Sequence, residues 1–475
     1  MHTDDAAAIE TLQTLFQQQK RAYQQEMMPS YDVRIERLNQ LEAMILQNQD
    51  KIAAALLADF GSHAPELTRI TEVLGPVSRV RFAKKQLKKW MKPHKRPIDR
   101  LLFGMAKNEL IYQPVGVVGN MSPWNFPIDI SFGPLVDILA AGNRAIVKPS
   151  ENAPHCAELI KQLISETFAL DLVAVVTGGV ELAQAFSKMP WDHLLFTGGP
   201  EIGKRVMAAA AENLTPVTLE LGGKNPTIIT ADNLTLKTVM AIMATKMVKA
   251  GQMCITSDYV FVPADQINSF VSLAQEAMAK LYPKVINNGD SASIINAHHF
   301  ERLQSYLEEA RAKARVVELN PAGETADPAQ RKLVPTLVLD PSDDLLVMKH
   351  EIFGPILPIT PYSDMQDVID YINGGERPLA LYIFSKDKAT IQRVIDNTIS
   401  GGVAVNAVSL HAMQASLPFG GTGRSGTGHH HGFEGFVAFS KAKPVFTQAP
   451  VDGSSLLFPP YGRAVNRLLD FLLPR

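Results

Sequence analysis

Two different spacings of hydrophobic residues divide the chain. Near its start, apolar side chains recur every three or four positions, as at Ile35, Leu38 and Leu41, with polar residues between them. This period predicts amphipathic helices over residues 5–60, and the same spacing predicts further helices over 65–92.

From about residue 110, short apolar runs alternate with helical segments. The runs predict strands at 115–120, 144–148, 172–177, 193–197, 226–230 and 258–262. The segments between them predict helices at 132–141, 154–168, 181–187, 235–250 and 266–281. This alternation is typical of parallel, doubly wound sheets. We therefore expect an α/β fold, with a second α/β set over residues 225–420.

Several segments between and after these elements predict turns, loops or the end of a helix. Gly61 predicts the end of a helix, and residues 320–330 predict a surface loop. The glycine-rich stretch 419–426 predicts a structured turn, because apolar segments flank it on both sides. The tail, 450–475, ends in an apolar helical segment that runs through Leu472.

Composition narrows the class of protein. A chain of 475 residues is too long for one ordinary core, so two or three domains are expected. A net charge of -2 gives no electrostatic reason to expect nucleic acid or a membrane as partner. Two cysteines far apart suggest a reducing compartment. The acidic N-terminus contains no apolar segment typical of a signal peptide, so a cytoplasmic location is expected.

Cys254 is the first candidate for chemistry. It lies in a glycine-containing turn, and the other cysteine, Cys156, falls in a predicted helix as a small buried residue. Glu220, which is followed by Leu221 and the two glycines Gly222 and Gly223, lies 34 residues upstream. A thiol nucleophile and a carboxylate base are the minimum set for forming and hydrolysing a thioester.

Two turns after predicted strands are candidates for binding a nucleotide. Gly199 and Gly203 follow one strand, where backbone N–H groups can face a phosphate, although a plain strand–helix turn explains the pattern equally well. Lys148 and Glu151 follow another strand, where a carboxylate can accept hydrogen bonds from a ribose. Ser150 as a helix N-cap beside an acidic first turn is also physically sound, and both interpretations can hold at the same time.

The remaining candidates are weaker when each is taken alone. Asn125 can supply an oxyanion donor or simply form a turn. Glu351 can bind a ribose, act as a base or lie in a surface turn. Residues 429–431 are three histidines, but neighbours in a strand point in opposite directions, so no metal site is expected.

Together, and in this order, these pieces resemble the aldehyde dehydrogenase superfamily. The matching motifs are PWNFP at 123–127, KPSE at 148–151, FTGG at 196–199, ELGGK at 220–224, GQMC at 251–254, EIFGP at 351–355 and PFGG at 418–421. The short N-terminus, the His-Gly-Phe sequence after 426 and PPY at 459–461 resemble the class 3 branch. Within it, residues 140–145 and 251–260 look most like bacterial coniferyl aldehyde dehydrogenases.

The resemblance implies a role for each candidate. Cys254 would attack the aldehyde, Asn125 and the backbone N–H of Cys254 would stabilise the oxyanion, and Glu220 would activate water. NAD, or NADP as an alternative, would be held by Trp124, Lys148, Glu151, Gly199, Gly203, Leu221, Glu351 and Phe353. The substrate would contact Phe126, Met253 and Phe419, although each of these can also be a core residue. In this chain Gly199 replaces a serine that many members carry, and Gln252 and Met253 replace smaller residues.

The resemblance also implies the architecture and the partners. A Rossmann-like NAD(P)-binding domain would comprise residues 1–97 and 115–222, and a catalytic α/β domain 223–428. A small β bridging element at 98–114 and 429–475, with strands near 98–114 and 436–448, would build a homodimer. The expected substrate is coniferyl aldehyde or a related aromatic aldehyde, with medium-chain aliphatic aldehydes as the alternative. Acyl transfer to CoA, or a non-catalytic protein that keeps the fold, are further alternatives.

Overall fold

The computed structural model describes residues 5–450, 452, 454 and 458–473. Its N-terminal part is helical, as the apolar spacing predicts. The helices are α1 (Asp5–Gln25), α2 (Tyr31–Gln47), α3 (Gln49–Phe60), α4 (Pro65–Thr68), the π-helical turn η1 (Arg69–Val73) and α5 (Leu74–Trp90). Helix α3 ends at Gly61, whose φ of 82° suits a residue without a side chain.

The first sheet follows these helices. Its strands are β3 (Val117–Met121), β4 (Arg144–Lys148), β5 (Val173–Val175), β6 (His193–Gly198), β7 (Val217–Leu221) and β15 (Gly426–Thr427), in the order β15-β7-β6-β3-β4-β5. All neighbours are parallel except β15, which returns late in the chain to pair antiparallel with β7. The connecting helices are α7 (Asp129–Ala141), α8 (Pro154–Thr167), α9 (Val180–Ser187) and α10 (Pro200–Ala211).

The second sheet contains seven strands in the order β10-β11-β12-β9-β8-β13-β14. They are β8 (Pro226–Ile229), β9 (Tyr259–Pro263), β10 (Arg315–Glu318), β11 (Thr336–Leu339), β12 (Ile356–Tyr362), β13 (Ala380–Phe384) and β14 (Gly402–Val405). Only β10 pairs antiparallel. The helices of this part are α11 (Leu236–Met247), α12 (Ile267–Leu281), α13 (Ala297–Lys313), α14 (Leu346–Lys349), α15 (Met365–Gly374) and α16 (Lys388–Asn397).

The helix predicted over 235–250 ends three residues earlier than expected. Helix α11 ends at Met247, and the following turn η3 (Val248–Gly251) places Lys249 and Ala250 at φ values of 49° and 53°. Left-handed backbone cannot continue a right-handed helix. The spacing of apolar residues carries no signal for this reversal, which lies just before Cys254.

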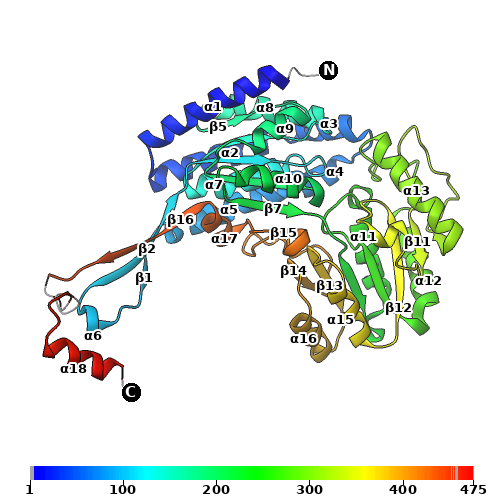
Figure 1. Ribbon diagram of the computed structural model, residues 1–475. Helices are drawn as coiled ribbons and strands as arrows, with labels where there is room; N and C mark the ends of the chain where they lie inside the picture. The colour runs from blue at the N-terminus through cyan, green and yellow to red at the C-terminus, as the bar shows by residue number, and fades with distance from the viewer. Residues whose placement is uncertain (1–4, 451, 453, 455–457, 474–475) are drawn as a thin grey trace.

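A three-stranded antiparallel arm projects from the body at the lower left of Figure 1. Its strands are β1 (His94–Arg96), β2 (Lys107–Pro114) and β16 (Ser440–Thr447). The bridging strand predicted near 98–114 is wrong in its first half, where the short helix α6 (Arg100–Phe103) and a turn lie instead. Helix α17 (Gly432–Ala438) precedes β16, and α18 (Arg463–Leu472) lies near the tip of the arm, as the apolar tail predicts.

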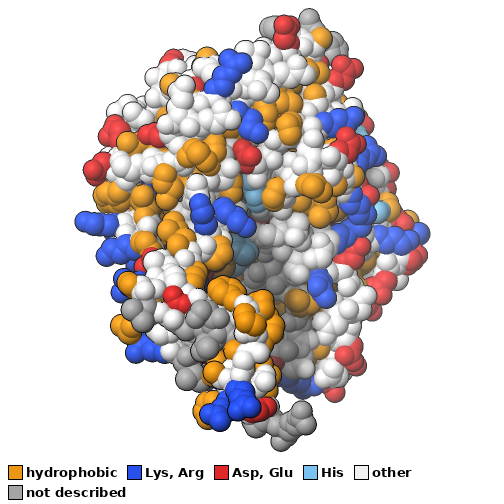
Figure 2. All heavy atoms as spheres, turned by 60° about the vertical axis from the view of Figure 1, so that its left-hand side comes forward, with side chains coloured by type: hydrophobic (Ala, Val, Ile, Leu, Met, Phe, Trp, Pro, Cys, Tyr) orange, Lys and Arg blue, Asp and Glu red, His pale blue; other side chains and the backbone are white. Residues whose placement is uncertain are grey.

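Hydrophobic side chains remain exposed on the arm side of the molecule. Figure 2 shows this side, with orange side chains lying among Lys and Arg. Phe446 on β16 and Phe471 on α18 are both exposed. Across the described ranges, no helix combines the length and the apolar character needed to cross a membrane.

Candidate active site

Four of the sequence motifs meet at the carboxyl edge of the first sheet. The carboxyl ends of β3, β4, β6 and β7 and the loops after them carry residues 123–127, 148–151, 198–200 and 220–224. The strands are parallel and their ends are in register, because Met121 of β3 pairs with Lys148 of β4, and Gly198 of β6 pairs with Leu221 of β7. Ligands of open α/β sheets bind at this edge.

The other motifs come from the opposite edge of the second sheet. Cys254 precedes β9, and Glu351 precedes β12, so both lie at the amino ends of parallel strands. The chain passes from the carboxyl end of β7 to the amino end of β8 through residues 222–225 alone. The two sheets therefore meet end to end, and the candidate site lies between them.

The Cys254 loop is held by side chains on both sides. The Asn225 amide donates to the carbonyl oxygens of Cys254 (2.7 Å) and Thr256 (3.1 Å). The buried Gln252 amide donates to the Ser293 carbonyl (3.0 Å) and accepts the N–H of Ile295 (2.9 Å). These bonds fix the backbone around the thiol, a requirement for precise positioning.

Immediately upstream, a buried ion pair links this loop to the N-terminal helices. Lys249 donates to Glu72, and both side chains are 0% exposed. Lys249 also donates to the Asn125 carbonyl (2.6 Å) and lies 4.1 Å from the centre of the Phe126 ring. The other carboxylate oxygen of Glu72 accepts the N–H groups of Ile128 (3.0 Å) and Asp129 (2.8 Å). One pair thus joins the Cys254 loop to the Asn125 loop.

Replacing Lys249 by Met should destabilise the protein by about 3–5 kcal/mol, because it leaves the Glu72 carboxylate buried without its partner. The double variant Lys249→Met with Glu72→Gln should recover part of this loss, since no unpaired charge then remains. Thermal unfolding of both proteins checks the expectation. As a control, Lys280→Met removes an exposed i,i+4 pair with Glu276 and should change stability by less than about 1 kcal/mol. A melting temperature unchanged by Lys249→Met would contradict the argument.

On one side of Cys254 lies an apolar cavity of about 240 Å³. Phe126, Met253 and Phe419, the three residues predicted to contact substrate, line it together with Cys254. At its rim, Ile70, Leu410 and Met413 are exposed, so the opening is apolar as well. Polar residues also line this cavity, namely Asn125, Glu220, Arg79, Asp129, His430 and His431.

A second cavity of about 320 Å³ reaches Cys254 from the other side. It also contains Asn125 and Glu220, and five of the residues predicted to hold the cofactor line it: Trp124, Gly199, Leu221, Glu351 and Phe353. His299 and Arg302 on α13 also line it, and the rings of Trp124 and His299 lie 5.1 Å apart, measured between their centres. Cys254, Asn125 and Glu220 therefore lie where the two cavities meet.

Three predicted cofactor residues lie outside this cavity. Lys148 and Glu151 form an ion pair of 3.0 Å at the end of β4, with Lys148 buried and Glu151 exposed. Gly203 lies inside α10, where an added Cβ would collide with the Leu221 side chain, so it allows close helix–strand packing. By contrast, a Cβ at Gly199, the N-cap of α10, would meet open space.

Burial dominates the acid–base properties of the site. It raises the pKa of the Cys254 thiol, and the nearby carboxylates of Glu351 and Glu220 raise it further. Burial also raises the pKa of Glu220 well above its usual range. The pKa of Glu351 rises to about 8, mainly through burial and then through Asp258. Neither carboxylate oxygen of Glu220 has a hydrogen-bond partner within the described part of the chain, so this group is free to bind a water molecule.

The histidines at 429–431 differ from the expectation that neighbours point in opposite directions. His430 makes only an isolated bridge to Phe419, and His430 and His431 both line the cavity of Phe126 and Phe419. No group of three or more His, Cys, Asp or Glu side chains suited to a metal occurs within the described ranges.

Sequence reasoning did not identify several residues of the site. Glu72 and Lys249 lie 177 positions apart, and nothing local marks them as partners. Arg79 lies in the helical region predicted over 65–92, where the spacing of apolar residues gives it no special role. Asp129, His299 and Arg302 lie on α7 and α13, at positions outside the predicted helices.

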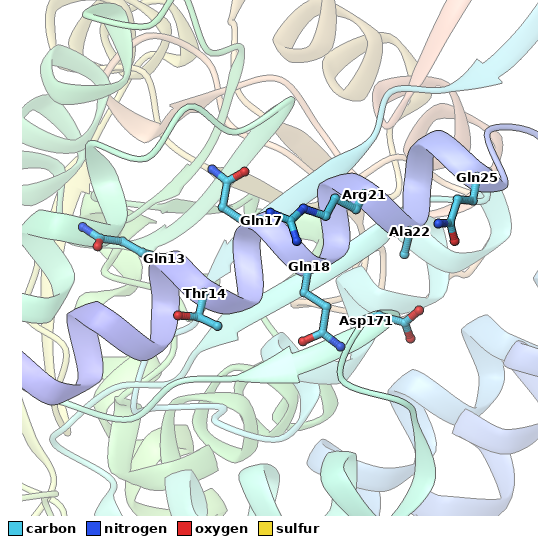
Figure 3. Close-up of a pocket in the computed structure, with 8 residues that line it drawn as sticks. All are labelled: Gln13, Thr14, Gln17, Gln18, Arg21, Ala22, Gln25 and Asp171. Carbon is cyan, nitrogen blue, oxygen red and sulfur yellow. The ribbon is translucent and has the colours of Figure 1, made fainter.

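A separate hollow on the surface of α1 contains no such chemistry. Figure 3 shows the residues that line it. They are Gln13, Thr14, Gln17, Gln18, Arg21, Ala22, Gln25 and Asp171. Amide side chains dominate this set, and none of its members lines either cavity at Cys254.

Comparison with known proteins agrees with this geometry. Residues 5–445 match the model of the aldehyde dehydrogenase family. The coniferyl aldehyde dehydrogenase of Pseudomonas sp. (strain HR199) is 44% identical over 98% of this chain and 96% of its own length. A probable coniferyl aldehyde dehydrogenase of Caulobacter vibrioides is also 44% identical, over 96% of this chain and 95% of its own.

Solved structures of aldehyde dehydrogenases are also similar to this chain. The substrate-bound AldH of Staphylococcus aureus superposes with a TM-score of 0.91 at 33% identity, covering 97% of this chain and 99% of its own. An NAD+ complex of a Bacillus cereus aldehyde dehydrogenase superposes with a TM-score of 0.82 at 25% identity, covering 93% and 89%. The NAD(P)-dependent oxidation of aldehydes is the activity of this family. The chain belongs to the aldehyde dehydrogenase family.

Proposed function

We propose that this protein oxidises an aromatic aldehyde to the carboxylic acid, with Cys254 as the nucleophile. The observation that carries the proposal is the meeting of Cys254, Glu220 and Asn125 where the two cavities join. The aldehyde enters through the apolar cavity, and the cofactor occupies the other. Each reactant then approaches the same thiol from its own side, as a reaction between two bound molecules requires.

The residues of the second cavity fit a nicotinamide cofactor. Gly199 leaves open space at the N-terminus of α10, where backbone N–H groups favour an anion such as a phosphate. Glu351 lies against the backbone at Gly222, where it is suited to accept hydrogen bonds from a ribose. When bound, NAD(P) supplies the hydride acceptor for the oxidation.

The chain's own residues account for the other steps. Cys254 loses its proton and its sulfur attacks the aldehyde carbon, giving a thiohemiacetal. The Asn125 amide, which donates to the Gln252 carbonyl at 3.1 Å, turns toward the oxyanion, and the backbone N–H of Cys254 is the second donor. After oxidation to the thioester, Glu220 takes a proton from a water molecule, which attacks the acyl carbon and releases the acid.

The aromatic substrate class is supported by the cavity and by the relatives. The wall of the cavity includes the rings of Phe126 and Phe419, and its rim is apolar. Three relatives at 44% identity carry the name coniferyl aldehyde dehydrogenase or its probable form. A medium-chain aliphatic aldehyde is the second candidate, because Ile70, Leu410 and Met413 at the rim suit an alkyl chain equally well.

The rate of cofactor reduction with a panel of aldehydes tests the proposal. We expect the purified protein to reduce NAD, with the highest kcat/KM for coniferyl aldehyde among coniferyl aldehyde, benzaldehyde, hexanal and succinic semialdehyde. NADP in place of NAD reports the cofactor preference. Fast turnover of hexanal alone would keep the chemistry and remove the aromatic class. No turnover of any pair, with or without CoA, would overturn the proposal.

We also propose that two copies of the chain associate through the arm, in a cytoplasmic protein. The outer edge of β16 has no strand partner within the described ranges, and Phe446 on it is exposed. An edge of this kind is a template for pairing with a second chain. Measuring the molar mass in solution tests the dimer. We expect twice the mass of one chain for the wild-type protein and a lower mass for a Phe446→Lys variant.

A further inference from the structure

The inner part of the apolar cavity contains polar groups that the reaction does not use. Along η1 and α5, the wall of the cavity begins at Ile70, which is 54% exposed, and ends at Arg79, which is 8% exposed. His430 and His431 lie beside Arg79 at this inner end. The His431 ring lies 2.9 Å from the Arg79 guanidinium, measured from Nε2 to Nη1.

Among these groups, His430 has the fewest hydrogen bonds to its side chain. Its residue is 1% exposed, yet neither Nδ1 nor Nε2 has a hydrogen-bond partner within the described ranges. Its backbone is fixed on both sides, because its N–H and carbonyl each bond to Phe419 at 2.8 Å. Its ring packs against Phe419 at 5.7 Å and His431 at 4.2 Å between ring centres. A buried polar group without a partner is destabilising, and a bound ligand with a donor and an acceptor would satisfy both ring nitrogens.

Two neighbouring N–H groups are free as well. A guanidinium only donates, so Nε2 of His431 must be the acceptor in its bond with Arg79. The proton of the neutral His431 ring is therefore on Nδ1, which has no partner within the described ranges. The Nε of Arg79 has none either. Neutral His430 adds one donor and one acceptor.

The charge of the cluster indicates a neutral ligand. Arg79 already forms an ion pair with Asp129, which lines the same cavity. A substrate carboxylate would thus be buried beside a cation whose charge is largely compensated. A hydroxyl group, which donates one hydrogen bond and accepts others, matches the free groups of His430, His431 and Arg79 without adding charge.

We propose that His430, with Arg79 and His431, forms a hydroxyl-binding subsite that selects aromatic aldehydes carrying a phenolic hydroxyl. The inference rests on the proposed function, since it takes this cavity as the aldehyde site. The aromatic ring packs between Phe126 and Phe419, and the hydroxyl reaches the inner end of the cavity. There it accepts from a ring N–H and donates to the free nitrogen of His430.

A pair of substrates that differ only in the hydroxyl tests the subsite. We expect the wild-type protein to prefer 4-hydroxycinnamaldehyde over cinnamaldehyde by at least about tenfold in kcat/KM, since a site built for a hydroxyl rejects the analogue that lacks it. In His430→Phe this preference should fall by at least about tenfold. His430→Gln, which keeps a donor and an acceptor, should retain part of it.

His411 provides the matched control. It is a partly buried histidine whose Nδ1 has no hydrogen-bond partner among the described residues, but it does not line the cavity. His411→Phe should leave the preference between the two substrates unchanged.

Two outcomes would overturn the subsite and leave the proposed function standing. One is an equal kcat/KM for both substrates in the wild-type protein, which needs no variant to fold. The other is an equal loss for both substrates in His430→Phe, which indicates a packing role.

Failure of the proposed function looks different, because the wild-type protein would then oxidise neither aldehyde. Calorimetric binding of 4-hydroxycinnamate and cinnamate would decide on the subsite in that case. Tighter binding of the hydroxylated acid, lost in His430→Phe, would support it, and equal Kd values would overturn it.

Discussion

Replacing Cys254 by Ala is expected to lower kcat/KM by at least about 10⁴-fold with any aldehyde. Among the residues that the structure describes, no other thiol lines the two cavities that meet at Cys254. Without a thiolate the thiohemiacetal cannot form, and the bound aldehyde has no route to the acid. Losses of this size are typical when the nucleophile of a covalent mechanism is removed. Steady-state formation of reduced cofactor measures the effect.

Cys156→Ala is the matched control for this experiment. Cys156 is fully buried in α8 and lines neither cavity. Its replacement should leave kcat/KM within about threefold of the wild-type value and lower stability by about 1 kcal/mol through the small space it opens. If Cys254→Ala kept more than a hundredth of the activity, the covalent mechanism proposed for this thiol would be wrong.

Replacing Glu220 by Gln should separate the two halves of the reaction. The thioester can still form, but water is no longer activated, so turnover should fall by about 10²–10⁴-fold. Rapid mixing with aldehyde and cofactor should give a burst of about one reduced cofactor per subunit, followed by a slow steady rate. Mass spectrometry of the quenched protein should find the acyl group on Cys254.

The pH dependence of this step has a definite sign. Burial raises the pKa of Glu220, so the carboxyl group is protonated below that pKa and cannot accept a proton from water. The steady-state rate of the wild-type protein should therefore rise with pH as Glu220 ionises, and the rise should be absent in Glu220→Gln.

Glu351→Gln is the control for a buried carboxylate near the same thiol. It should raise the KM for the cofactor without a burst. A burst in Glu351→Gln and none in Glu220→Gln would contradict the proposed roles. It would indicate that Glu351, and not Glu220, activates the water molecule.

The alternating part of the fold could be predicted well from sequence, because each buried strand is a short apolar run bounded by turns. Strand β4 was predicted with the bounds that the structure gives it. The end of α11 was not, because the reversal at Lys249 and Ala250 is stabilised by contacts with Glu72 and Asn125 rather than by local sequence. The arm was predicted only in part, since β1 spans only three residues.

The candidate site also combines residues that local motifs predict with residues that only the folded chain identifies. Cys254, Glu220 and Asn125 belong to short motifs, and the structure brings them to one place. Their roles remain predictions, as do the domain ranges. In the sequence, His430 is a candidate only as a metal ligand, together with the adjacent histidines at 429 and 431, and no metal site is expected there. Its contact with Phe419 and its unpartnered nitrogens exist only in the folded chain.

The ion pair between Glu72 and Lys249 also has a consequence for the order of folding. Its partners lie 177 residues apart, so closing this contact brings together segments with a large sequence separation. The first of them is synthesised well before the second sheet exists. Until that sheet has formed and docked, the Glu72 carboxylate lacks its cationic partner Lys249, and the loop before the thiol lacks this ion pair to hold its left-handed turn. The reactive geometry is therefore a property of the completed chain, and an incomplete intermediate lacks it.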